Sequence, residues 1–258
     1  METWLSIWSI GQESTLDDFK ILQKAGFDGV EIWAEHLRAK ETFEYARQTG
    51  LRTSIHLPFH DLNIATPDTI IYERAFHVLN EWMDILAGYG GSHAVLHGGY
   101  AWSSEERDET LCRVQSRLMK LNEAAQKRGI VLLLENLIPD RLNYCHHVAS
   151  SLEEWTGLLQ ACNLKACLDT GHLAIMGNEL EETVKQLGEL LGEIHVSEND
   201  GKADLHLLPG EGNHYTEKLI DILTKYQFTG PVVFEINPYQ YTLKNIVDNM
   251  AKFREKQK

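Results

Sequence analysis

Short apolar segments alternate eight times with longer amphipathic segments along the 258 residues of this chain. Most of the short segments are near-continuous apolar runs, which is typical of parallel strands that are buried on both faces. Strand and helix patterns that alternate over a whole chain imply a parallel sheet. We predict strands over Leu5–Ser9, Gly29–Trp33, Arg52–Leu57, His93–His97, Ile130–Asn136, Lys165–Asp169, Glu193–Ser197 and Val232–Ile236.

The segments between these strands have the periodicity of surface helices. For example, Leu16, Phe19 and Leu22 recur at helical spacing, and Gly26 follows at the point where the helix would end. The segment Asp200–Asn213 has no such periodicity and is predicted to be a long loop. The helices that we predict span Thr15–Lys24, Pro67–Tyr89, Glu105–Arg128 and Lys244–Lys256.

The repeat and the length together favour an α/β fold of the (β/α)8 TIM-barrel type. An open, doubly wound sheet is the alternative. The first turn after a strand lacks the GxGxxG pattern, so the sequence does not support a dinucleotide-binding sheet. No linker or change in composition divides the chain, and we therefore expect one domain over residues 1–258.

The charge and composition of the chain indicate which classes of substrate or partner it can bind. The formal net charge is −14, which argues against a nucleic-acid substrate because lysine and arginine supply most of the affinity for phosphates. The longest apolar runs, such as Ile130–Leu134, are too short to span a bilayer, and the first residues lack an export signal. The four cysteines form no CxxC pair, which is typical of free thiols in the cytoplasm. We expect a cytoplasmic protein with a small-molecule substrate and no membrane partner; a homo-oligomer is compatible with the sequence but no feature demonstrates one.

Six consecutive predicted strands end in a histidine or a carboxylate. A charged group at the end of an apolar run is costly unless it is paired or bound to metal. In a barrel these strand ends meet at one mouth, where active sites form. Histidine and carboxylate together suit Zn²⁺, Mn²⁺, Fe²⁺ or Co²⁺. The sequence therefore predicts a site for divalent metal built from His56, His97, Glu135, Asp169, His195 and Glu235.

Three more polar residues extend this prediction. His172 follows Asp169 by three residues across a glycine-containing turn, and Asp204 and His206 lie two apart in the long loop, where a locally extended chain would point them the same way. Each residue taken singly is more simply explained as a hydrogen-bonded core group, an ion-paired carboxylate or a helix cap. The shared position of six strand ends favours the metal site. The remaining histidines lack this placement, and we expect surface or core positions for His36, His60, His77, His93, His146, His147 and His214.

Several short segments are similar in sequence to motifs of a known protein family. They are GFDGVEI at 26–32, HLPF at 56–59 with DLN at 61–63, LLEN at 133–136, CLDTGH at 167–172, and the stretch from His195 to LPGEG at 208–212. With these segments the chain resembles the xylose isomerase-like TIM-barrel superfamily, which contains sugar isomerases and epimerases and also endonuclease IV. The resemblance covers nearly the whole chain.

The resemblance implies two alternative ligand sets. In the epimerase branch one metal would be held by Glu135, Asp169, His195 and Glu235, and the two glutamates would also act as catalytic acid and base. In endonuclease IV nine ligands hold three zinc ions, and all nine have matches here. The additional sites would be His56, His97 and Glu135 for one ion and His172, Asp204 and His206 for another. Ligand identity alone therefore permits one to three ions of Zn²⁺, Mn²⁺ or Co²⁺ per chain.

The acidic charge and the lack of a basic or intercalating insertion in the early loops favour the sugar branch. We expect a metal-dependent isomerase or epimerase of a sugar, sugar phosphate or keto-polyol, which transfers a proton through a metal-stabilised enediolate. The alternatives are a multinuclear zinc hydrolase or phosphoesterase of the endonuclease IV type, and a non-enzymatic binding protein. His172 is expected to orient a substrate hydroxyl. Apolar walls suited to a small ligand are expected from Trp8, Trp33, Phe59, Tyr100 and Trp102, although each could equally be ordinary barrel packing.

Overall fold

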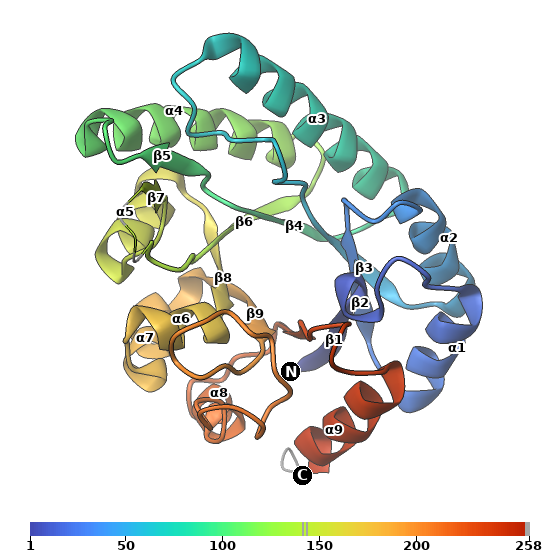
Figure 1. The fold of residues 1–258 in the computed structure, drawn as a ribbon. Coiled ribbons are helices and arrows are strands. Elements are labelled where there is room, and N and C mark those ends of the chain that lie inside the picture. Colours follow the sequence, from blue (N-terminus) through green and yellow to red (C-terminus); the bar gives the residue numbers. More distant parts are fainter. Residues whose placement is uncertain (141, 143, 256–258) are drawn as a thin grey trace.

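The computed structural model describes residues 1–140, 142 and 144–255. In this part of the chain, eight parallel strands form a closed barrel in the order β1-β10-β9-β8-β6-β4-β3-β2 (Figure 1). The predicted (β/α)8 barrel is confirmed. Its strands are β1 (Glu2–Ser6), β2 (Gly29–Trp33), β3 (Arg52–His56), β4 (His93–Leu96), β6 (Val131–Glu135), β8 (Lys165–Asp169), β9 (Leu191–Val196) and β10 (Pro231–Phe234).

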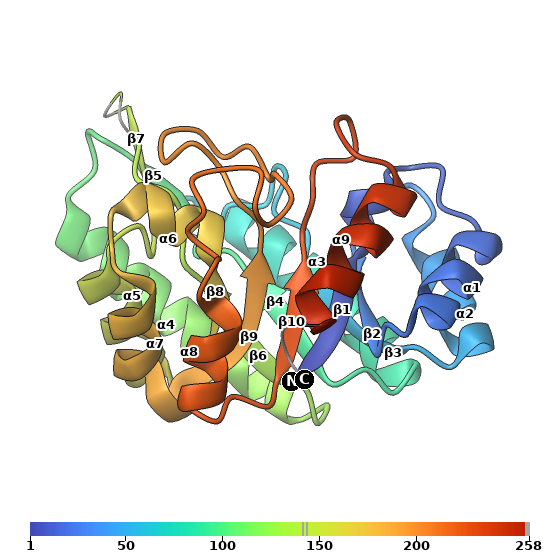
Figure 2. The same ribbon diagram turned by 90° about the horizontal axis from the view of Figure 1, so that it is seen from below.

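Helices follow the strands and cover the outside of the barrel (Figures 1 and 2). In the described residues, none of them combines the length and the apolar character needed to cross a membrane. The helices are α1 (Leu16–Ala25), α2 (Ala39–Thr49), α3 (Thr69–Gly88), α4 (Arg107–Gln126), α5 (Leu152–Cys162), α6 (Thr170–Met176), α7 (Leu180–Leu187), α8 (Leu219–Lys225) and α9 (Leu243–Glu255), with 3-10 turns η1 (Ile7–Ile10) and η2 (Gly188–Leu190).

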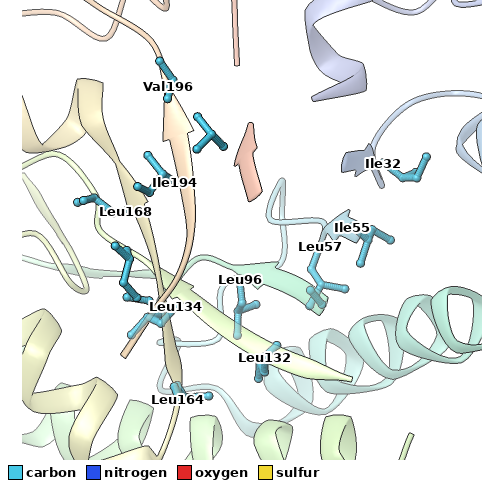
Figure 3. Packing of buried hydrophobic residues seen from close by; sticks show 14 of the residues in the cluster. Ile32, Ile55, Leu57, Leu96, Leu132, Leu134, Leu164, Leu168, Ile194 and Val196 are labelled. Carbon is cyan, nitrogen blue, oxygen red and sulfur yellow. The ribbon is translucent and has the colours of Figure 1, made fainter. Parts of the chain in front are cut away.

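Side chains along each strand point alternately to the surrounding helices and to the interior of the barrel. In β6, Leu132 and Leu134 point to the helices and are buried, whereas Leu133 and Glu135 point into the barrel. Figure 3 shows apolar side chains of the outer layer on alternate positions of the strands, including Ile194 of β9. Because all eight strands run in the same direction, their carboxyl ends lie at one end of the barrel, and the inward positions near these ends face a common space.

Local signals set the ends of the predicted helices. The carboxylate of Asp68 accepts hydrogen bonds from the backbone N–H groups of Ile70 (2.8 Å) and Ile71 (3.1 Å), which starts α3 two residues after the predicted Pro67. Gly26 ends α1 with a left-handed φ of 87°, as expected for a residue without a side chain. The predicted end of the last helix, Lys256, lies outside the described residues.

The prediction for the first strand is wrong by three residues. The apolar run suggested Leu5–Ser9, but β1 is Glu2–Ser6 and the following residues form η1. The hydroxyl of Ser9 explains the difference, because it accepts a hydrogen bond from the backbone N–H of Ile236 (2.8 Å) and thereby fixes the turn against the end of β10. A continuous apolar run does not show where pairing stops, and the turn carries Trp8 toward the mouth of the barrel.

A small second sheet was not predicted. Strands β5 (Tyr100–Trp102) and β7 (Cys145–His147) pair in antiparallel fashion within the loops that follow β4 and β6. In Figure 2 this sheet stands at the end of the barrel to which β9 points. Arg107 supports it by donating hydrogen bonds to the carbonyl oxygens of His146 and His147. The sheet therefore forms part of the wall on the carboxyl side of the barrel.

Candidate active site

The nine residues proposed as metal ligands come together at the carboxyl ends of the strands. They form three clusters, and within each cluster the possible ligand atoms lie within 4.8 Å of one another. Glu135 belongs to two of the clusters. The clusters are His56, His97 and Glu135; Glu135, Asp169, His195 and Glu235; and His172, Asp204 and His206.

The second cluster is positioned by strand geometry. Glu135 and Asp169 are the last residues of β6 and β8, His195 lies near the end of β9, and Glu235 directly follows β10. Glu135, Asp169 and His195 are almost completely buried, with exposed fractions of 1%, 0% and 0%. Three carboxylates and one imidazole thus share a space that water hardly reaches, which is unfavourable unless positive charge balances them.

Three histidines are oriented by the same hydrogen-bond pattern. His56, His172 and His206 each place Nδ1 within reach of a backbone carbonyl oxygen, at 3.0, 2.8 and 3.0 Å. When Nδ1–H donates to that carbonyl, Nε2 of the neutral ring carries a lone pair. This Nε2 atom faces a carboxylate oxygen of Glu135 in the case of His56 (3.2 Å), and of Asp204 for the other two (3.2 and 3.1 Å). Two acceptors face each other favourably only when a proton or a cation lies between them.

The second cluster also contains buried polar atoms without partners. In the described residues, Oδ2 of Asp169 and Nδ1 of His195 have no hydrogen-bond partner. Nδ1 of His195 lies 3.1 Å from a carboxylate oxygen of Glu235 and 3.8 Å from one of Glu135. Unpartnered buried atoms of this kind call for an explanation such as an ion. The donor set fits a divalent cation held by these four residues.

Burial and the histidines shift the pKa values of the carboxyl groups in opposite directions. Burial opposes ionisation of Glu135, but His97, His172 and His56 hold the pKa of Glu135 well below its ordinary value. Burial likewise opposes ionisation of Glu235, whose pKa His195 and His206 nevertheless lower to about 2. For Asp169 burial prevails over the attraction of His172 and raises the pKa to about 6. Protons on the histidines thus balance part of the negative charge where a cation would otherwise do so.

A cavity of about 530 Å³ opens onto these clusters, a size typical of small-molecule sites. Its lining includes His172 and the aromatic side chains predicted as substrate contacts, Trp8, Trp33, Phe59 and Tyr100. Trp102, the fifth predicted aromatic residue, does not line the cavity; it lies on β5 and is 58% exposed.

The aromatic walls are held by specific contacts with the polar clusters. Phe59 stacks on the ring of His97, with centroids 4.2 Å apart and an interplanar angle of 28°. Trp8 meets His206 edge-on at 4.7 Å. The same rings that form the apolar wall therefore also restrict the orientation of two of the proposed metal ligands.

Asn63 has a structural role that is not apparent from the sequence. Its side chain accepts hydrogen bonds from the backbone N–H groups of Ala65 (2.9 Å) and Tyr100 (3.0 Å) and donates to the carbonyl oxygen of Tyr100 (2.7 Å). It therefore joins the loop after β3 to β5, and both line the cavity.

For other residues near the site, the sequence supported either a broad prediction, surface or core, or no prediction. His60 and His147, expected on the surface or in the core, line the cavity. Glu31, His93 and Glu193 lie buried inside the barrel beneath His195. The period-two alternation of the strands carries a signal for these three, because a charged residue inside an apolar strand, on the same face as a site residue, points to the same interior.

The fold and the site together define a (β/α)8 barrel with a histidine and carboxylate cluster at the carboxyl ends of its strands. A family model described as xylose isomerase-like TIM barrel matches residues 19–256, and the chain belongs to this family.

Individual relatives are distant. An uncharacterized protein of Methanocaldococcus jannaschii is 26% identical over 234 residues, covering 86% of this chain and 79% of that protein. D-psicose 3-epimerase of Enterocloster bolteae is 24% identical over 250 residues, covering 90% of this chain and 79% of that enzyme. A crystal structure of a D-tagatose 3-epimerase-like protein superposes with a TM-score of 0.84 at 22% identity, covering 99% of this chain and 96% of the other. This last similarity supports the fold.

Proposed function

We propose that this chain is a sugar epimerase or isomerase that depends on a divalent metal ion, Zn²⁺, Mn²⁺ or Co²⁺. The observation that carries the proposal is the cluster of Glu135, Asp169, His195 and Glu235, in which two glutamates border the same cavity. Membership of the family and the relative named as a D-psicose 3-epimerase support the same chemistry.

The four residues of this cluster would hold the metal ion. The bound ion would supply Lewis acidity toward a substrate carbonyl group. Glu135 and Glu235 are both ionised at neutral pH, since the pKa of each lies below its ordinary value. One ionised glutamate would remove the proton from the carbon next to the carbonyl. The other would first take up a proton from a substrate hydroxyl or from water, and would then return that proton to the substrate. His172 has Nδ1 directed to the carbonyl oxygen of Asn136 and borders the cavity, so it would orient a substrate hydroxyl.

The cavity suits an uncharged sugar better than a sugar phosphate. Among the described residues that line it, none is lysine or arginine. A phosphate group requires positive charge or a cradle of backbone N–H groups, and the carboxylates of Glu135, Glu235 and Asp204 would repel it. Trp8 and Trp33 offer apolar faces on which the C–H side of a sugar ring can pack. We therefore propose a free ketose or a keto-sugar derivative as the substrate.

A second candidate is a hydrolase or phosphoesterase with two or three metal ions. The clusters of His56, His97 and Glu135 and of His172, Asp204 and His206 favour it, because each resembles a complete site. Closely spaced ions clamp a phosphoryl group and supply hydroxide. The number of metal ions per chain separates the two proposals, since one ion supports the epimerase and three support the hydrolase.

The direct test is proton exchange. The metal-loaded protein is incubated in D₂O with a panel of free ketoses, and deuterium at carbon is followed by NMR and mass spectrometry. We expect deuterium at the carbon next to the carbonyl together with an epimerised or isomerised product. If no ketose in a broad panel takes up deuterium while a phosphate ester is hydrolysed, the epimerase proposal is wrong and the second candidate replaces it.

Location and assembly stay predictions. All four cysteines are free thiols, which supports the proposed cytoplasmic location. Homo-oligomer formation is a prediction that a measurement of mass in solution tests.

A further inference from the structure

His195 connects the proposed metal site with the interior of the barrel. Its Nδ1 atom faces the carboxylate of Glu235 at 3.1 Å. Its Nε2 atom points the other way and lies 3.3 Å from carboxylate oxygens of both Glu193 and Glu31. The side chains of His195, Glu193 and Glu31 are 0% exposed. One imidazole thus lies between two sets of carboxylates, and its two nitrogen atoms must have different roles.

Glu193 is held on its far side by a second histidine. The Nε2 atom of His93 lies 2.5 Å from Oε2 of Glu193, and Nδ1 of His93 lies 2.7 Å from the hydroxyl of Ser92. The ring of Trp4 packs 5.5 Å from the ring of His93. His93 is the first residue of β4, so this row of side chains runs from the amino-terminal end of the barrel up to the proposed metal site. Each oxygen of the Glu193 carboxylate therefore has its own histidine partner.

The carboxylate of Glu31 lies as close to Nε2 of His195 as that of Glu193 does, but it is not aligned for a hydrogen bond. Neither of its carboxylate oxygens has a hydrogen-bond partner among the described residues. In contrast, Nε2 of His195 and Oε1 of Glu193 satisfy hydrogen-bond geometry. Two carboxylates at the same distance from Nε2 of His195 thus differ in alignment, and only that of Glu193 has the geometry of a hydrogen-bond acceptor.

The protonation of one imidazole nitrogen determines what the other can do. When Nε2–H donates to a carboxylate, Nδ1 of the neutral ring carries the lone pair and can bind a metal ion. A carboxylate acceptor also makes the imidazole a better donor to the metal, and loss of such a partner typically weakens metal binding about 10- to 100-fold. Here the acceptor is fixed by His93, so the ring orientation does not depend on the metal being present.

We propose that Glu193, anchored by His93, is a positioning residue that holds His195 with its proton on Nε2 and its Nδ1 lone pair directed at the metal site. Glu31 does not have this role. The inference rests on the metal site of the proposed function and says nothing about the substrate.

The first test compares metal affinity among single variants. Mn²⁺ binding is measured by calorimetric titration for the parent protein, Glu193→Gln, Glu193→Leu and Glu31→Gln, and the thermal unfolding of each metal-free variant is recorded beside it. Glutamine keeps an oxygen acceptor without the charge, whereas leucine removes both. We expect the dissociation constant to rise about 10-fold for Glu193→Gln, about 100-fold for Glu193→Leu, and less than threefold for Glu31→Gln. Equal losses for the Gln variants of residues 193 and 31, or a Glu193→Gln value within twofold of the parent, would overturn the proposal.

The second test needs no variant of Glu193 and so does not depend on its folding. The parent protein is labelled with ¹⁵N-histidine and loaded with Zn²⁺, and the His195 signals are assigned by their absence in His195→Asn. We expect a proton on Nε2 and Zn²⁺ on Nδ1. Zn²⁺ on Nε2, or no Zn²⁺ bound at all, would contradict the inference. A protein that passes both tests yet exchanges no sugar proton would disprove the proposed sugar chemistry and leave this inference intact.

Discussion

Nε2 of His56 lies 3.2 Å from a carboxylate oxygen of Glu135, while Nδ1 of the same ring lies 3.0 Å from the carbonyl oxygen of Leu57. When Nδ1–H donates a hydrogen bond to this carbonyl oxygen, the lone pair of Nε2 is directed at the carboxylate of Glu135. The same arrangement recurs at His172 and His206. Because acceptors facing acceptors require a cation or an additional proton, this relationship links the metal content, the stability and the pH response of the protein.

Removal of metal is expected to destabilise the protein. Without an ion, the carboxylates of Glu135, Asp169 and Glu235 repel one another in a buried space. An ion that binds only the folded state stabilises it by about 2.7 kcal/mol when its concentration is 100 times the dissociation constant. Thermal unfolding with EDTA, and then with added Mn²⁺, Zn²⁺ or Co²⁺, measures this difference. An unfolding temperature that no divalent ion raises would count against a metal site.

Loss of one glutamate should remove proton transfer with little effect on folding. In Glu235→Gln the side chain keeps its size but can no longer act as a base, and a positioned acid or base typically contributes about 10²- to 10⁴-fold to rate. We expect deuterium exchange into a ketose substrate to fall by at least 100-fold. Glu181→Gln is the control, because Glu181 is a half-exposed residue of α7 that pairs with Lys225, outside the cavity. Similar rates in the two variants would exclude Glu235 as a catalytic group.

Metal counting in two histidine variants tests the multinuclear alternative. If one ion per chain binds at the central cluster, His97→Ala and His206→Ala should retain the metal content of the parent. His77→Ala serves as the control, since His77 lies exposed on α3 beside Glu81. Elemental analysis after loading and dialysis gives the count. A parent with three ions, of which each variant loses one, would instead establish the hydrolase-like arrangement.

The contact between Asn63 and Tyr100 should control substrate affinity. Asn63→Ala removes three side-chain hydrogen bonds that join the loop after β3 to β5, and we expect a loss of about 1–3 kcal/mol in the free energy of unfolding. The wall of the cavity should become less ordered, so KM should rise more than kcat falls. Asn80→Ala removes a hydrogen bond to Phe76 on α3 and is the control. An unchanged KM in Asn63→Ala would show that this wall does not contact the substrate.

The metal-free protein should lose stability as the pH rises from 6.5 to 9. Although burial opposes it, Glu135 raises the pKa of His56 to about 9, and Asp204 does the same for His206, from an ordinary value of 6.5. A histidine whose pKa is higher in the folded state stabilises that state below pH 6.5, and this contribution disappears as the pH passes 9. Urea unfolding at pH 6.5 and 9.5 measures the loss.

The same urea unfolding experiment at the two pH values is repeated with a divalent metal ion present. An ion requires neutral imidazoles, so its binding strengthens as the pH rises and should reduce or reverse the loss of stability. His206→Gln should have a smaller pH dependence than the parent in the metal-free state. A free energy of unfolding that rises between pH 6.5 and 9.5 without metal would contradict the assignment of protons to these histidines.

The barrel could be predicted from sequence because its signals are local. Apolar strands such as Lys165–Asp169 and Gly29–Trp33 were predicted with the ends that the structure has. The first strand was misplaced because Ser9 ends the pairing through a bond to Ile236, 227 residues away. The sheet of β5 and β7 was missed for a related reason, since each strand has three residues and neither is regular enough to be recognised alone.

The sequence by itself determined which residue types end the strands, and hence that His56, Glu135 and Asp169 would share one end of the barrel. That follows from the two-residue period of a strand and from the closure of parallel strands into a ring. Only the tertiary structure decided which atoms face one another: the direction of Nδ1 and Nε2 in each histidine, and the alignment of Glu193, rather than Glu31, for a hydrogen bond with Nε2 of His195. Hydrogen-bond geometry depends on side-chain torsions and on neighbours from distant strands, and no local pattern encodes it.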